Sequence, residues 1–184
     1  MDFLIKTGKM GFWLLLPIVL ISNTRTSDNR LLDDPFVEDG SYVVKAKEIS
    51  DLTISGKAVF KKSALLKGQK KKFSRIEINL GPSKNGIQHT MGLVLFKQAD
   101  GSNNPVGHYN VSQKTLGFSP VGEGVFGFAD VGTLGELPFY TEHGTVYVSK
   151  EENGLLSGTL NLVMRNFRGK AIKITGSFRA RNEN

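Results

Sequence analysis

Alternation of apolar and polar residues with a period of two dominates the C-terminal stretch 154–182 and constrains the fold more than any other feature. This period is the repeat of a β-strand, in which successive side chains point to opposite faces. The five residues of NFRGK separate two such runs, a spacing typical of a hairpin with a longer loop. The stretch therefore predicts an antiparallel hairpin with one buried and one solvated face. The residues expected on its buried face are Gly158, Leu160, Leu162, Met164, Ile172, Ile174, Gly176 and Phe178.

The same alternation recurs in the middle of the chain. It is clear in segments 51–61 and 73–81, where apolar residues or glycines take one face and polar residues the other. Segment 91–97 is more uniformly apolar, as expected of a strand that is buried on both faces. The first two segments therefore predict strands with one inward face. The residues expected on that face are Leu52, Ile54, Gly56, Ala58, Phe60, Ile76, Ile78 and Leu80.

Further short strands are predicted at 107–113, 124–131 and 144–150, each bounded by Gly, Pro or Asn. After the N-terminal segment, no stretch keeps the spacing of a helix. About eight short strands with many glycines favour an all-β fold, and we predict an antiparallel β-sandwich. The alternative is a lipocalin-like β-barrel, because both architectures use alternating strands.

The N-terminus predicts export. Lys6 and Lys9 precede the apolar stretch 10–21, and small polar residues follow at 22–24. A positive region before an apolar core of about 7–15 residues is the pattern of a secretory signal peptide, whereas a membrane span needs about 20 residues. We therefore predict a periplasmic or secreted protein. An uncleaved segment that tethers the protein to the membrane is the alternative.

The sequence divides into three predicted segments. A length of 184 residues favours a single folded domain. Residues 1–24 are predicted to be the signal peptide or anchor, residues 25–40 a polar linker, and residues 41–182 one β domain. The linker prediction depends on a polar and acidic composition with little periodicity.

Several classes of catalytic and cofactor site are excluded or disfavoured. The sequence has no cysteine, which excludes disulfides, thiol nucleophiles and cysteine-ligated metals. Gly122, Gly124 and Gly127 match the spacing of a dinucleotide-binding loop, but such a loop opens a helix. The residues after Gly124 continue instead as a predicted strand. We therefore interpret these glycines as a turn that enters a strand.

The three histidines, His89, His108 and His143, are not spaced as metal ligands. They are expected on the surface, in loops or at strand ends. Since the sequence also lacks a dense cluster of His, Asp and Glu, we predict a protein that is not an enzyme and binds no metal or cofactor.

Segment 57–75 carries the strongest charge feature. It contains eight basic residues and no acidic one, compared with a formal net charge of +7 for the chain. Such a patch suits an anionic partner of the cell envelope: lipopolysaccharide, an acidic glycan or lipid head groups. Nucleic acid is disfavoured because few aromatic residues interleave for base stacking. The alternative is a solvated hairpin whose lysines protect a sheet edge from aggregation. The eight residues are Lys57, Lys61, Lys62, Lys67, Lys70, Lys71, Lys72 and Arg75.

Four short motifs follow one another in the C-terminal half: PVGHYNV, GTVYVSK, SGTL and IKITGSF. Their order resembles the middle and closing strands of small exported β-sandwich proteins of unknown function from Bacteroidetes-type bacteria. The resemblance implies an envelope location and a β-rich fold, and it implies no substrate. The lipid-anchored cysteine common in that family has no counterpart in this sequence.

These observations predict an exported, non-enzymatic envelope or binding protein. One alternative is a lipocalin-like carrier of a small apolar ligand, and another, disfavoured, is an enzyme on a β-scaffold. The core distinguishes the first two, because a carrier needs an enclosed apolar cavity of about 300 Å³ or more, whereas a filled core favours a binding module.

Overall fold

The structure is a computed structural model, and it describes residues 37–47, 52–68, 71–83, 86–98, 104–111, 115–116, 119–120 and 123–183. The predicted signal segment and the predicted linker up to residue 36 lie outside the described residues. In the described part of the chain, no helix has the length and apolarity needed to cross a membrane.

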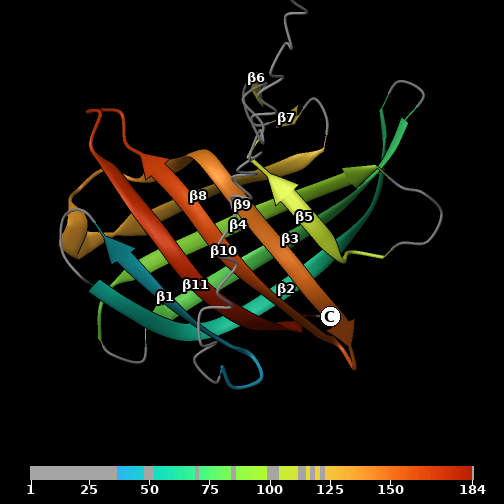
Figure 1. Cartoon of the computed structure of the whole chain (residues 1–184), viewed down its shortest axis with the longest axis horizontal. Helices are drawn as coiled ribbons and strands as arrows, with labels where there is room; N and C mark the ends of the chain where they lie inside the picture. Colours follow the sequence, from blue (N-terminus) through green and yellow to red (C-terminus); the bar gives the residue numbers. More distant parts are fainter. Residues whose placement is uncertain are drawn as a thin grey trace, which may run out of the picture. The chain divides into compact units, whose positions relative to one another are not determined.

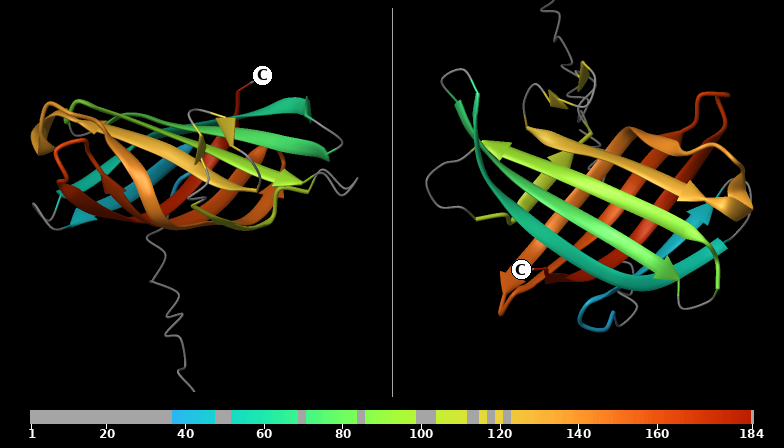
Figure 2. Two further views of the ribbon diagram at one scale, coloured as in Figure 1. Left: turned by 90° about the horizontal axis from the view of Figure 1, so that it is seen from above. Right: turned by 180° about the vertical axis from the view of Figure 1, so that it is seen from behind.

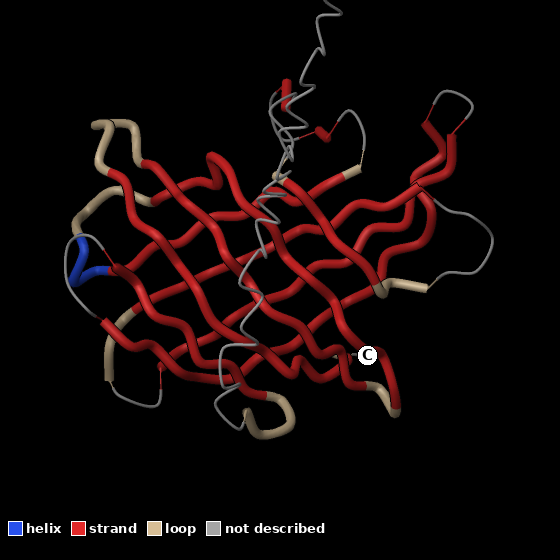
Figure 3. Tube along the Cα trace, in the orientation of Figure 1, coloured by secondary structure: helices blue, strands red, loops and turns tan. Residues whose placement is uncertain are grey.

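Eight antiparallel strands form a sheet that closes on itself into a barrel (Figure 1), and strands make up most of the described chain (Figure 3). Around the barrel the order is β9, β10, β11, β1, β2, β3, β4 and β8, and β8 returns to β9. The short strand β5 pairs with β9, and β6 pairs with β7. The barrel strands are β1 (Ser41–Lys47), β2 (Leu52–Gly68), β3 (Lys71–Ser83), β4 (His89–Gln98), β8 (Gly124–Val131), β9 (Phe139–Glu152), β10 (Leu155–Arg165) and β11 (Ala171–Asn182). The other elements are β5 (Gly107–Asn110), β6 (Thr115–Leu116), β7 (Ser119–Pro120) and the 3-10 turn η1 (Gly132–Leu134).

The all-β prediction is confirmed. The sheet closes into a barrel, which was the stated alternative to the predicted sandwich. The described residues contain no α-helix. Seen from above, β3 and β4 lie on one side and β10 and β11 on the other, and the strands of the two sides cross (Figure 2). These two facing layers are why a sandwich pattern and a barrel pattern look alike in the sequence.

The predicted hairpin and its inward faces are confirmed. β10 pairs with β11 from Leu155–Arg181 to Arg165–Ala171. Inward side chains such as Ile54, Ile78 and Ile174 are at most 2% exposed. The predicted turn into a strand at Gly124 is also present, because β8 starts there.

Packed side chains fill the interior of the barrel. The residues of the hydrophobic core cluster are each at most 4% exposed, so almost none of their surface is accessible to water. An eight-stranded barrel is about wide enough for its own side chains to fill. The core therefore corresponds to the filled case rather than to an enclosed ligand cavity. The aromatic side chains in it that are less than 2% exposed are Tyr42, Phe60, Phe139 and Phe178.

Glycines let aromatic rings lie flat against neighbouring strands on both faces. A Cβ atom on Gly158 would lie 2.7 Å from Cζ of the inward Phe178. On the outer face, a Cβ on Gly92 would lie 2.7 Å from Cε1 of Phe128. Phe128 thus covers β4 from outside, which explains why the predicted burial on both faces of segment 91–97 is largely present.

His89 corrects the expectation that all three histidines lie on the surface. It is 8% exposed because it shares the inward face of β4 with Met91. Its Nδ1 lies 3.0 Å from the carbonyl oxygen of Ile87, and its Nε2 contacts the hydroxyl of Tyr42. The Tyr42 hydroxyl also lies 3.0 Å from the Gly81 carbonyl oxygen, and burial raises the pKa of Tyr42. Polar partners on both sides make the buried ring tolerable.

The strand β9 has two kinds of neighbour along its length. One edge pairs with β10 from Tyr140 to Glu152. The other edge pairs with β8 at Phe139 and Tyr140. Further along, from Thr145 to Val148, the same edge pairs with β5. Where β8 leaves β9, the Gly127 amide donates to the Thr141 hydroxyl at 3.0 Å.

Candidate binding site

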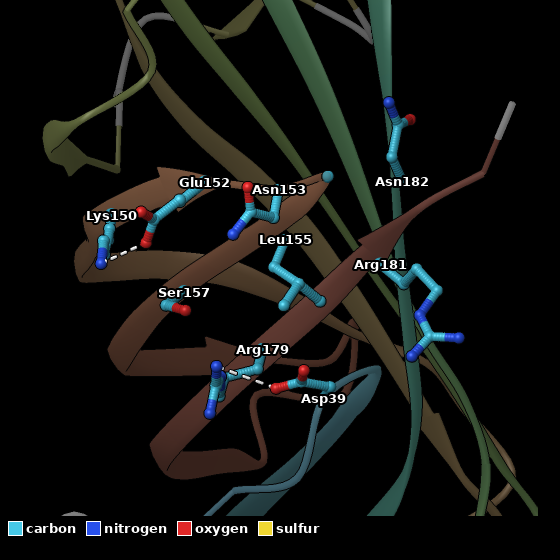
Figure 4. Close-up of a pocket in the computed structure, with 10 residues that line it drawn as sticks. Asp39, Lys150, Glu152, Asn153, Leu155, Ser157, Arg179, Arg181 and Asn182 are labelled. Atoms are coloured by element: carbon cyan, nitrogen blue, oxygen red, sulfur yellow. Dashed lines mark ion pairs between the residues drawn. The ribbon is translucent and has the colours of Figure 1, made fainter.

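A polar groove of about 620 Å³ lies on the outside of the barrel (Figure 4). It is formed by the β9–β10 turn, the last residues of β11 and the turn that precedes β1. These segments lie far apart in the sequence and are joined by the ladder of β9, β10, β11 and β1. The lining residues are Asp39, Lys150, Glu152, Asn153, Gly154, Leu155, Ser157, Arg179, Arg181 and Asn182.

A tight two-residue turn fixes one wall of the groove. Asn153 and Gly154 join β9 to β10, with φ angles of +53° and +73°. Asn-Gly is the preferred sequence for such a hairpin turn because both residues tolerate a positive φ. The amide of Asn182 donates to the Gly154 carbonyl oxygen at 2.8 Å. The end of β11 is therefore tied to the turn.

Two ion pairs lie on opposite sides of the groove (Figure 4). Arg179 Nη2 is 2.8 Å from Asp39 Oδ1, and Lys150 contacts the Glu152 carboxylate. The hydrogen bond from Lys150 lowers the pKa of Glu152, so this carboxylate stays charged further into acid. Each pair neutralises one cation of the groove at neutral pH.

Arg181 is the third cation, and it has no ion-pair partner among the residues that the structure describes. Its side chain is exposed, and its position in the β10–β11 ladder is opposite Leu155, which forms the apolar part of the lining. Three basic residues face two carboxylates, so the lining carries one uncompensated positive charge. A guanidinium of this kind offers a fork of donors to a carboxylate, sulfate or phosphate.

Two lysines of the predicted basic segment form ion pairs with residues that adjoin the groove residues in the sequence. Lys61 Nζ is 3.3 Å from a carboxylate oxygen of Glu183, and Lys62 contacts Glu151. Glu151 and Glu183 directly adjoin groove residues in the sequence. The acidic partners of these lysines thus come from outside segment 57–75.

The other members of that segment are placed differently. Arg75 is 2.8 Å from Glu77 on the same strand, and Lys57 is exposed on β2. The strands β2 and β3 contain Lys67, Lys71 and Lys72, whose side chains are not described, and Lys70 lies outside the described residues. The binding role predicted for the segment stays a prediction.

His108 and His143 lie at the surface, as expected. The His108 ring stacks on Tyr147, and His143 Nδ1 is 3.8 Å from Glu142 Oε2. Glu142 also accepts a hydrogen bond from Arg165 at 2.8 Å, which lowers the pKa of the Glu142 carboxyl. No group of three potential metal ligands occurs within the described ranges.

The comparisons with known proteins identify no relative. No family model matches the chain, and no curated protein or solved structure shows a significant match to it. The resemblance to small exported β-sandwich proteins stays a prediction.

Sequence reasoning missed the groove, although it found the strands around it. The Asn153–Gly154 turn and the alternating outward residues Arg179 and Arg181 were visible signals. What the sequence lacks is the pairing that brings Asp39 beside them, through the hydrogen bond from Gly40 N to the Arg179 carbonyl oxygen.

Proposed function

We propose that this protein is a non-enzymatic binding protein that holds an anionic ligand in the groove on the outside of a filled barrel. The observation that carries the proposal is the exposed Arg181, which has no ion-pair partner among the described residues, in a groove whose other cations are already paired. The net charge of +7 would draw anions toward the molecule before they reach the groove.

The packed core supports a site on the outer surface. Tyr42, Phe60 and Phe178 occupy the interior with at most 1% exposure, so an apolar ligand would have to displace them. A lipocalin-like carrier is the second candidate, because the closed barrel is the architecture that such carriers use. A test with an apolar fluorescent probe separates the two. The carrier would enclose the probe with blue-shifted emission, whereas the binding protein would leave it in solution.

The export prediction suggests where the ligand is found. The signal pattern at residues 1–24 supports a place outside the cytoplasm. Surfaces there present lipopolysaccharide, acidic glycans and lipid head groups, which share negatively charged carboxylate, sulfate or phosphate groups. Binding in the groove requires only one of these negatively charged groups.

Calorimetric titration with a sulfated hexasaccharide tests the proposal. Arg181→Gln should weaken binding about tenfold or more, because a charge-assisted hydrogen bond to the ligand is lost. Arg168→Gln is the matched control, since Arg168 is exposed in the turn at the opposite ends of β10 and β11. Equal affinity in the native protein and in Arg181→Gln would refute the groove as the anion site.

A further inference from the structure

Two stacked aromatic rings are displayed on the outer face of the barrel next to the groove. His108 on β5 and Tyr147 on β9 have ring centroids 4.4 Å apart and planes inclined by 23°. The two residues are partners in the β5–β9 ladder. Their chain neighbours Tyr109 and Val146 are 3% and 0% exposed, so His108 and Tyr147 point outward. Tyr147 is 36% exposed.

Uncharged polar side chains surround this aromatic pair. Thr159 of β10 is the ladder partner of Tyr147, and Asn161 and Asn110 both pair with Thr145. Alternation places these residues on the same outer face as Tyr147. An asparagine amide both donates and accepts hydrogen bonds, as a ligand with many hydroxyl groups requires.

The aromatic pair and the groove form one continuous strip. Ser157 lines the groove, and Thr159 beside Tyr147 lies two residues further along β10, about 7 Å at about 3.3 Å per residue. Leu155, opposite Arg181, lies four residues from Thr159, or about 13 Å. One ligand that reaches both Arg181 and Tyr147 must therefore be an extended molecule.

We propose that the anionic ligand is an acidic oligosaccharide, with an acid group at Arg181 and a sugar ring stacked on the face of Tyr147 that is turned away from His108. This inference rests on the proposed function and names its ligand class. A pyranose ring has a face of C–H groups that suits the negative face of an aromatic ring, and hydroxyls at its rim that suit Thr159 and Asn161. A phosphate ion or a lipid head group has no such face. The charge pattern agrees, because the cation lies at one end of the strip and the aromatic end is lined by neutral residues.

Calorimetric titration of the full chain with galacturonic acid tetrasaccharide, the galacturonate monomer and inorganic sulfate tests this inference. Tyr147→Ala should weaken tetrasaccharide binding about tenfold and leave sulfate binding unchanged. Tyr147→Phe should retain native affinity because it keeps the ring. His108→Ala should also weaken tetrasaccharide binding, because it removes the ring that packs against Tyr147. Phe167→Ala is the control, since Phe167 is an aromatic residue with 84% exposure on the β10–β11 turn, away from the strip.

The outcomes separate this inference from the proposed function. If Arg181→Gln loses sulfate and tetrasaccharide binding while Tyr147→Ala and His108→Ala bind as the native protein does, the stacking inference is overturned and the anion site stands. If vesicles with anionic lipid bind through Arg181 and the tetrasaccharide does not, the ligand class is a lipid head group. If no anion binds, both proposals fail. Circular dichroism of each variant checks that the barrel is intact.

Discussion

The two edges of β9 show how differently this barrel is held together around its circumference. On one edge, β10 pairs with β9 from Tyr140 to Glu152, and β11 then pairs with β10 from Leu155 to Arg165. On the other edge, β8 contributes two residue pairs, Phe128–Tyr140 and Ala129–Phe139. We call the first a continuous ladder, because every residue of β10 is paired although β9 has two bulges, and the second a seam. Because each backbone hydrogen bond adds to local stability, the seam should open more readily than the ladder.

The difference also shows where a surface for ligands can form. The continuous ladder fixes the spacing between Arg181 and Tyr147, since neither can shift without breaking several backbone hydrogen bonds. The short strand β5 fills the place beyond the seam, pairs with β9 along one edge and brings His108 onto Tyr147. Its other edge meets β8 through the single bridge Val111–Val125 in the described chain. A rigid ladder thus carries the groove, and a less restrained strand supplies the second aromatic ring.

The largest expected effect is in the continuous ladder. Ile174→Ala removes an inward side chain of β11 that is 2% exposed, and it should lower the free energy of unfolding by about 2–5 kcal/mol. Lys173→Ala, one residue away and facing outward, should change it by about 0.5 kcal/mol or less. Urea denaturation measures both values. Similar losses in the two variants would mean that the register of β11 is wrong.

The second largest loss of stability is expected when the Tyr42 hydroxyl is removed, because this group links three strands of the barrel. The Tyr42 hydroxyl extends from β1 to Gly81 on β3 and His89 on β4. Tyr42→Phe keeps the ring and leaves buried polar groups without a partner, which should cost about 1–3 kcal/mol. Thermal and urea denaturation should both show the loss. Native stability in Tyr42→Phe would contradict a structural role for these hydrogen bonds.

Much of this comparison could be predicted from sequence, but only within single strands. Alternation identified the inward faces of β2, β3, β10 and β11, because period two reports local geometry. It did not identify which strands meet at the seam, since closure depends on pairing between β8 and β9. It also placed His89 on the surface, because the partners that satisfy its ring, Tyr42 and Ile87, become visible only in the fold.

The candidate site shows the same limit more sharply. Segment 57–75 stood out as a run of charge with no acidic residue inside it, yet Lys61 and Lys62 find carboxylates at Glu183 and Glu151. Arg181, one cation among 24 in the sequence, did not stand out. Arg181 is of interest because it has no ion-pair partner in the described part of the chain, and only the folded structure shows which residues surround it.

A smaller effect is expected at the seam itself. Thr141→Val preserves the shape of the side chain and removes the hydroxyl that accepts from the Gly127 amide. The loss should be about 1 kcal/mol, and it should be local. Hydrogen exchange of the Gly127 amide should become faster, whereas the amides of β10 and β11 keep their native rates. Equal acceleration in both regions would show that the seam does not open separately from the ladder.

The smallest effect is a pH dependence of ligand binding on the ladder side. The hydrogen bond from Lys150 lowers the pKa of Glu152 below its usual value. The ion pair is therefore intact at neutral pH and is lost as the pH falls through this lowered pKa, with Glu152 taking up a proton. The groove then gains one positive charge, and affinity for a sulfate monoester, which stays charged in this range, should rise about two- to fivefold.

Glu152→Gln tests this sign directly. The variant has no carboxylate at this position to protonate, so it should bind the sulfate monoester at neutral pH more tightly than the native protein does, and its pH step should be smaller. Glu136→Gln, an exposed change beyond η1 and far from the groove in the sequence, should keep the native pH profile. Calorimetric titrations from neutral to acid pH give the affinity of the native protein and of both variants. The difference between the native protein and Glu152→Gln is the contribution of Glu152. Weaker binding of the native protein at low pH would mean that Lys150 does not face the ligand.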